Sequence, residues 1–342
     1  MLRRPAADWR DRTAAFLRGD VTVRRLEPVE VAALPDLLNA RSLGSVLWRA
    51  ARMPPDSYSL EVAAGACHAG GMLSEAEIGS FVADGFVAIR DAVPAGVLRA
   101  CQEEIWSALA ERGVLRDAPA TWRDPVVRIP CPESEAFAAA GTQPSLWEAF
   151  DQLIGAERWW RRPGVGGTIP VRFPSQADPG DAGWHIEASY ETNGQWCVNH
   201  RSRARGLLVL YLFSDVDADS APTRVRPGSH RDAARALVPA GDAGMRWTEA
   251  AQLAAQASAA RPTSLVTGRA GDVFLCHPFL VHAASWPHNG RHPRIIAQPG
   301  VALHGSFPLV MPLSPVELPM AADPAPGDPG TSRICGNDRR SE

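Results

Sequence analysis

Two histidines and one glutamate in this chain have the residue types and the spacing of a metal site. His185 and Glu187 are separated by one residue in the segment GWHIEASY, and His282 follows 97 positions after His185 (282 − 185) in the segment GDVFLCHPFLVHAAS. Two imidazoles and one carboxylate are the ligand set of non-haem iron sites that keep open positions for other molecules. The trio therefore predicts a reactive metal centre and not a structural one.

The spacing of the first two ligands fits a β-strand. Successive side chains of a strand point to opposite faces, so His185 and Glu187 would project together while Ile186 turns into apolar packing. A His-x-Glu pair is weak by itself, because the solvent-facing side of any strand can carry two polar residues. The pair gains weight from the histidines of the later apolar run, which must supply a third ligand from a distant strand.

That later run offers His277 and His282 as alternatives for the third ligand. Both histidines stand in an apolar segment, where a buried imidazole without a partner would be unfavourable. Pro278 lies between them and interrupts the strand, so the alternation of side chains cannot choose one. We favour His282 as the ligand, with His277 as a core histidine whose ring donates to a carbonyl.

An arginine shortly after His282 is the candidate for binding an acid. Arg294 stands at the start of the apolar run Ile295-Ile296-Ala297. A buried guanidinium requires an anion, and its planar fork fits a carboxylate with two hydrogen bonds. Arg291 is the second candidate, and a surface position at the mouth of the strand is the alternative for both.

The composition favours a soluble protein with small-molecule partners. The chain has 342 residues, 45% of them hydrophobic, a net charge of −3 and a pI near 6.3. No basic field is available for nucleic acid or an anionic membrane, and no segment has the apolar length of a signal peptide or a membrane span. Six scattered cysteines indicate free thiols in a reducing cytosol, so we expect a cytoplasmic location.

The pattern along the chain divides it into three parts. Residues 1–71 form a helical or irregular N-terminal extension of unknown role, residues 72–310 form the main domain, and the Pro-, Gly- and Asp-rich residues 311–342 are expected to be disordered. The main domain begins with a Ser-x-x-Glu capping signal at Ser74, which predicts a helix to Ala83. A strand over 86–90 and a second helix from Pro94 to about Arg112 follow.

Short β-rich runs separated by Gly, Pro, Asp and Asn dominate the region from about Thr168 to Leu309. They are TIPVRF, GWHIEASY, GLLVLYLF, TRVRPGSH, DVFLCH and PRIIAQPGVAL. Such spacing is typical of a β-sandwich or jelly roll, so the fold class is mainly β with flanking helices. The Ala-rich interval between Arg231 and Arg261 is expected to be helical.

Four segments in this order resemble the phytanoyl-CoA dioxygenase family of Fe(II)/2-oxoglutarate oxygenases: HIE, APTRVRPGSH, GDVFLCHPFLVHAAS and RHPRIIAQ. The resemblance covers roughly residues 72–309. It implies a double-stranded β-helix, a cupin-like jelly roll, in which His185, Glu187 and His282 match the iron ligands. Arg294 matches the arginine that binds the distal carboxylate of 2-oxoglutarate. The usual carboxylate ligand of the family is aspartate, and this chain has Glu187.

The expected function is therefore a dioxygenase that uses Fe(II), 2-oxoglutarate and dioxygen to hydroxylate or otherwise oxidise a small molecule, releasing succinate and carbon dioxide. A cupin-like metalloenzyme without 2-oxoglutarate and a non-catalytic jelly-roll binding protein are the alternatives. Substrate contacts could come from Arg128, Arg172, Trp184, Trp196 or Trp286, although core packing is the commoner role of tryptophan.

Overall fold

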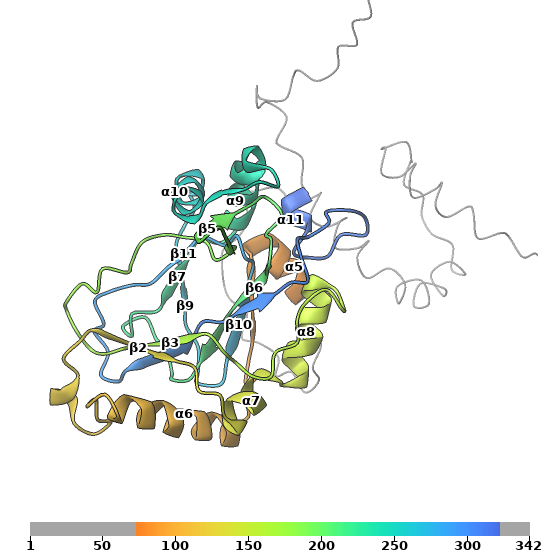
Figure 1. Ribbon diagram of the computed structural model, residues 1–342. Helices are drawn as coiled ribbons and strands as arrows, with labels where there is room; N and C mark the ends of the chain where they lie inside the picture. Colours follow the sequence, from red (N-terminus) through yellow and green to blue (C-terminus); the bar gives the residue numbers. More distant parts are fainter. Residues whose placement is uncertain (1–72, 322–342) are drawn as a thin grey trace, which may run out of the picture. The chain divides into compact units, whose positions relative to one another are not determined.

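Figure 1 shows the computed structural model of the protein, which describes residues 73–321. The N-terminal extension that we expected over residues 1–71 lies outside the described residues. Residues 322–342 of the expected tail lie outside them as well. The fold is therefore that of the predicted main domain and the residues that directly follow it.

The entry into the domain is a helix, a strand and a second helix, as the sequence predicts. Helix α5 (Glu75–Asp84) begins with a complete capping box at Ser74 and ends at Gly85, whose φ of 86° is left-handed. Glycine adopts this conformation without the steric penalty of a side chain, which lets the chain turn directly into strand β1 (Phe86–Ile89). Helix α6 (Ala95–Ala110) then follows Pro94.

A large antiparallel sheet forms the centre of the domain. Its strand order is β1-β10-β6-β12-β3-β2, and β13 also pairs with β6. The further strands are β2 (Val126–Pro130), β3 (Thr168–Arg172), β6 (Arg205–Leu212), β10 (Val273–Cys276), β12 (Arg294–Ala297) and β13 (Gly300–Ala302). Neighbours far apart in sequence thus lie side by side, as β3 and β12 do.

A smaller sheet carries one of the predicted ligands. Its order is β11-β7-β9, from β11 (His282–Ala283), β7 (Thr223–Val225) and β9 (Ser264–Val266). An isolated antiparallel bridge joins His185 to His282 at its edge. A third sheet, β4-β5-β8, contains β4 (Tyr190–Thr192), β5 (Gln195–Val198) and β8 (Met245–Arg246).

The large and small sheets pack against each other through a shared apolar cluster. Leu208, Leu210 and Leu212 alternate along β6 and lie in one cluster with Val225 of β7 and Val266 of β9. The intervening residues of β6 point to the other face, because side chains alternate along a strand, and belong to the core that includes the helices. Two packed antiparallel sheets with flanking helices confirm the predicted jelly-roll class.

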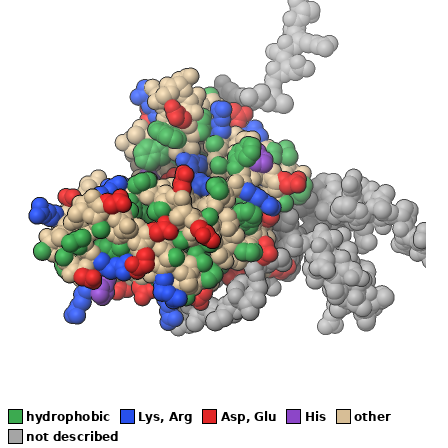
Figure 2. All heavy atoms as spheres, turned by 60° about the horizontal axis from the view of Figure 1, so that its bottom comes forward, with side chains coloured by type: hydrophobic (Ala, Val, Ile, Leu, Met, Phe, Trp, Pro, Cys, Tyr) green, Lys and Arg blue, Asp and Glu red, His purple; other side chains and the backbone are tan. Residues whose placement is uncertain are grey.

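Helices α6, α7 (Glu135–Gly141) and α8 (Pro144–Ile154) lie along one side of the large sheet (Figure 1). The Phe137 ring of α7 is 5.4 Å from that of Phe213, directly after β6. The local sequence pattern did not predict α7 and α8. The expected Ala-rich helical region is confirmed as α9 (Ser229–Leu237) and α10 (Trp247–Ala257). On the face in Figure 2, acidic and basic side chains are interspersed.

The first residues of the predicted tail are part of the domain, which corrects the expectation of disorder from residue 311. Val316 and Glu317 are fully buried, and Arg158 forms an ion pair with Glu317 at 2.8 Å. The short helix α11 (Leu318–Ala321) follows. The Pro-rich composition of this segment favours disorder, but a contact with Arg158, which is far away in the sequence, stabilises it.

The cysteines of the described residues are free, as the sequence predicts. They are Cys101, Cys131, Cys197 and Cys276. Burial raises the pKa of Cys101 and Cys276 to about 12 and that of Cys131 to about 11. These three thiols are therefore protonated at neutral pH and act as small apolar groups in the core.

Candidate active site

The three predicted metal ligands converge in the folded chain. His185, Glu187 and His282 each offer a ligand atom, and these atoms all lie within 4.8 Å of one another. The backbones of His185 and His282 exchange two hydrogen bonds of 2.9 Å, and their ring centroids are 4.3 Å apart. Residues 97 positions apart (282 − 185) in sequence thus present their imidazoles side by side.

Both imidazoles are oriented for binding through the same nitrogen. The Nδ1 of His185 is 2.9 Å from the carbonyl oxygen of Gly183, and the Nδ1 of His282 is 2.9 Å from that of Leu280. Because a carbonyl only accepts, each Nδ1 carries the proton and each Nε2 keeps its lone pair, which is the arrangement that a metal-binding histidine needs. This tautomer is assigned from the contacts.

The electrostatic environment keeps the two histidines neutral. Burial lowers the pKa of His185, and burial together with the nearby His185 lowers the pKa of His282 to about 3. Both rings are therefore uncharged at neutral pH. A neutral imidazole is the form that ligates a metal, so no proton has to be displaced from either ring.

Glu187 projects beside the histidines although its segment is not a regular strand. Of the expected strand over GWHIEASY, the structure has the bridge at His185 and strand β4 from Tyr190. The Glu187 N–H donates to the carbonyl of Pro278 at 3.1 Å, and Ile186 is fully buried. Burial raises the pKa of the Glu187 carboxyl, and Arg205 opposes this. Among residues 73–321 no side chain forms an ion pair with this carboxylate, so a cation would offset its burial.

His277 lies outside this group and has its own partners. Its ring is 4.8 Å from the ring of His230, its Nε2 is 2.9 Å from the carbonyl of Val316, and its Nδ1 accepts from the Phe279 N–H at 3.0 Å. Burial lowers its pKa to about 3. His277 is thus a neutral core histidine, and the structure groups His282 with the other two ligands.

Arg294 is buried in the interior between the two sheets. Arg294 and Ile296 are two positions apart on β12 and therefore point to the same face, and Ile296 belongs to the cluster shared by both sheets. Only 1% of Arg294 is exposed, its Nη1 donates to the carbonyl of Ala221 at 2.8 Å, and its Nε has no hydrogen-bond partner among the described residues. Burial, and then Arg172, lower its pKa to about 9. Arg291, our second candidate, is exposed and does not join it.

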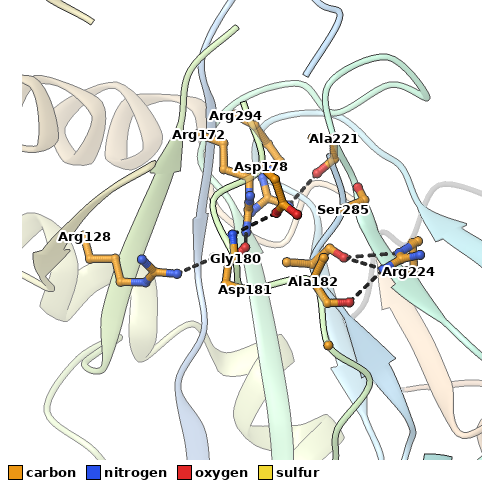
Figure 3. A network of polar contacts seen from close by, with 12 residues as sticks. Arg128, Arg172, Asp178, Gly180, Asp181, Ala182, Ala221, Arg224, Ser285 and Arg294 are labelled. Carbon is orange, nitrogen blue, oxygen red and sulfur yellow. Dashed lines mark hydrogen bonds and ion pairs between the residues drawn. The ribbon is translucent and has the colours of Figure 1, made fainter. Parts of the chain in front are cut away.

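Figure 3 shows the polar contacts around Arg294. Arg172 of β3 is its Cα partner in the sheet, and the Nη2 of Arg172 donates to Asp181 at 2.6 Å. The other oxygen of Asp181 accepts from Arg128, whose side chain is 51% exposed. Arg128 was predicted as a substrate contact, and the structure places it at the outer end of this ion-pair chain. Asp181 was not predicted, and no sequence pattern marks it.

The three tryptophans proposed for substrate contact have different surroundings. Trp184 lies under the guanidinium groups of Arg224 and Arg226, which are 4.8 and 4.3 Å from its ring, and it is partly buried against the core. Trp286 is 45% exposed and lines a cavity beside Arg172. Trp196 is 54% exposed on β5.

Comparison with known proteins identifies the family. The phytanoyl-CoA dioxygenase (PhyH) family matches residues 81–295. The chain belongs to the phytanoyl-CoA dioxygenase family. The matched residues contain the complete His185, Glu187 and His282 group and Arg294. The predicted family is therefore confirmed, and with it membership of a family of non-haem iron, 2-oxoglutarate-dependent oxygenases.

Several solved structures are similar to this member of the phytanoyl-CoA dioxygenase family. One is the epimerase SnoN in complex with Fe³⁺, alpha-ketoglutarate and nogalamycin RO, which is 19% identical in sequence. The match covers 76% of this chain and 91% of the SnoN chain, with a TM-score of 0.48. HygX from Streptomyces hygroscopicus, with nickel, 2-oxoglutarate and hygromycin B, is 16% identical, covers 68% of this chain and 88% of its own, and has a TM-score of 0.44. No curated protein matches the sequence. Within the described residues, no helix has the length and apolarity needed to cross a membrane.

Proposed function

We propose that the protein is an Fe(II)- and 2-oxoglutarate-dependent oxygenase that oxidises a small molecule. The observation that carries this proposal is the convergence of His185, Glu187 and His282 within 4.8 Å, in a domain of the phytanoyl-CoA dioxygenase family. The donor set fits iron because it combines two neutral imidazoles with one buried carboxylate. When bound, iron with 2-oxoglutarate and dioxygen would supply the oxidation of a substrate C–H bond, most simply as hydroxylation, with release of succinate and carbon dioxide.

The residues of this chain would hold and separate the reactants. His185 and His282 present Nε2, because their Nδ1 atoms are engaged by backbone carbonyls. Glu187 supplies the negative charge that balances part of the charge of a divalent cation. Arg294 would bind the distal carboxylate of 2-oxoglutarate, since a buried guanidinium without a carboxylate partner is an anion site. The family's usual aspartate is one methylene shorter than Glu187, so we expect the backbone of this ligand to lie farther from the metal.

Anaerobic titration tests the proposal directly. Fe(II) and 2-oxoglutarate added to the purified protein without oxygen should give a weak visible charge-transfer band, and oxygen should then lead to succinate. His282→Ala should abolish the band. His277→Gln is the matched control, because this buried histidine lies five positions earlier (282 − 277) and outside the site, and it should keep the band.

Arg294→Ala separates the oxygenase from the cupin-like alternative. If the variant keeps its metal but no longer binds 2-oxoglutarate, the oxygenase is supported. If the wild-type protein binds metal and shows neither the band nor succinate, the cupin-like enzyme replaces it. Protein that takes up no Fe(II) at all would instead point to the non-catalytic binding module.

A further inference from the structure

A cavity beside Arg294 has the chemistry of an anion site. Its lining includes Arg172, Ala221, Ser285 and His288. Ala221 also accepts the hydrogen bond from Arg294, so this cavity and the buried guanidinium share a wall. Ser285 of this wall follows His282 by three positions (285 − 282) in the chain.

Buried N–H groups of three side chains in this region lack an acceptor. They are the Nε of Arg172, the Nε of Arg294 and the Nε2 of His288, each without a hydrogen-bond partner among residues 73–321. The exposed fractions of these residues are 3%, 1% and 3%. A buried donor without an acceptor costs free energy, because water no longer solvates it. Three such donors in one region indicate a ligand that only accepts hydrogen bonds.

The proton of the His288 ring is on Nε2, the nitrogen that has no hydrogen-bond partner among the described residues. The N–H of Gly290 donates to the Nδ1 of His288 at 3.2 Å, so Nδ1 is an acceptor and Nε2 carries the proton. Burial, and then the charge of Arg294, lower the pKa of His288 to about 4. His288 is therefore a neutral donor at physiological pH and adds no third positive charge next to the two arginines.

The charges of the cluster also require an anion. Arg172 and Arg294 are direct Cα partners on β3 and β12, so two buried guanidinium groups lie in adjacent strands. One carboxylate, Asp181, bonds to Arg172 at 2.6 Å and is shared with the exposed Arg128 (Figure 3). Arg172 and Arg294 against the single carboxylate of Asp181 leave a net charge of about +1 in the low-dielectric interior, which one further carboxylate would neutralise.

We propose that Arg172 and His288 act together with Arg294 as the site for the distal carboxylate of the 2-oxo acid. This inference rests on the proposed function and extends it from one arginine to two arginines and an imidazole. Asp181 engages Nη2 of Arg172 and leaves its Nε–H for the ligand. Arg172 and His288 would thus make the enzyme selective for 2-oxo acids that carry a second carboxylate.

The test is a comparison of two acids on protein loaded with Zn(II), which binds the same ligand types without redox chemistry. The probes are 2-oxoglutarate and 2-oxovalerate, which share the chelating end and differ in the distal carboxylate. Isothermal titration calorimetry gives both dissociation constants. Arg172→Gln should weaken 2-oxoglutarate binding at least about thirtyfold, the loss typical of truncating a buried charge pair. The binding of 2-oxovalerate should change less than about twofold.

Two further variants separate direct contact from general damage. His288→Phe removes the Nε2–H donor and keeps an aromatic ring, so 2-oxoglutarate affinity should fall about tenfold. Arg128→Gln is the matched control, because Arg128 shares Asp181 with Arg172 but is 51% exposed and does not line the cavity. Its affinity for 2-oxoglutarate should stay within about twofold of wild type. Circular dichroism and Zn(II) stoichiometry verify folding, and Arg172→Lys replaces Arg172→Gln if the latter is unfolded.

Failure of this inference can be distinguished from failure of the proposed function. If the wild-type protein binds 2-oxoglutarate no better than 2-oxovalerate, the oxygenase assignment fails and the inference fails with it. If wild type prefers 2-oxoglutarate while folded Arg172 and His288 variants retain that preference, only this inference is overturned. An equal loss in Arg128→Gln would also overturn it, since the effect would then come from Asp181 and not from contact with the acid.

Discussion

Acid sensitivity should reveal the buried, neutral state of His277. The pKa of this imidazole falls from 6.5 to about 3 in the folded protein because the ring is desolvated. The unfolded chain therefore binds a proton below pH 6.5 that the folded chain does not bind until about pH 3. Stability is complete above the unfolded pKa and declines as the pH falls toward the folded one. From the unfolded pKa of 6.5 down to about pH 5 is about 1.5 pH units. At about 1.36 kcal/mol per pH unit, the free energy of unfolding falls by about 2 kcal/mol over this range.

The measurement is guanidinium chloride unfolding of metal-free protein at about pH 7.5 and about pH 5. The loss of unfolding free energy between these conditions should be about 2 kcal/mol smaller in His277→Gln than in wild type. Glutamine cannot take up the proton, and its amide can still donate to the Val316 carbonyl that His277 contacts at 2.9 Å. An unchanged pH dependence would refute the reasoning, because the ring would then titrate alike in both states.

Five other substitutions test the site and its supports. Gly85→Ala should destabilise the protein by about 1–3 kcal/mol, because φ is 86° and an added Cβ would lie 2.5 Å from the buried imidazole of His230. Gly79→Ala is its control inside α5: the added Cβ meets nothing within 4 Å and should stabilise the protein by up to about 1 kcal/mol in thermal melts. Trp184→Ala should lower the free energy of unfolding by about 3 kcal/mol in chemical denaturation. Trp286→Ala changes an exposed position and should lower it by less than about 0.5 kcal/mol. Equal losses in the two variants would show that Trp184 is not packed against its neighbours. Glu187→Asp should weaken Mn(II) binding about tenfold in competition titrations, and unchanged affinity would show that the extra methylene plays no part in placing the carboxylate.

Local patterns in the sequence predicted several elements because their causes lie within a few residues. The capping box of α5 depends on Ser74 and Glu77, three positions apart, and both of its hydrogen bonds form. Likewise β6 follows from the apolar run after Arg205. Helices α7 and α8 were not predicted, although Ser134 caps the first and Pro144 begins the second. Both helices are short, and their apolar residues are buried against the rest of the domain, so packing with distant residues stabilises them more than the local pattern does.

The sequence by itself determined the residue types of the site, their order and the family. The reason is that the donor atoms belong to the side chains of His185, Glu187 and His282 and do not depend on the fold. The tertiary structure decided which side chains meet. The sequence favoured His282 over His277, but only the bridge to His185 shows that His282 lies beside the first ligand, and the proposed role of Arg172 depends on its register opposite Arg294 on β12. Strand pairing and burial arise from contacts between residues far apart in the chain, and no local pattern of residues encodes them.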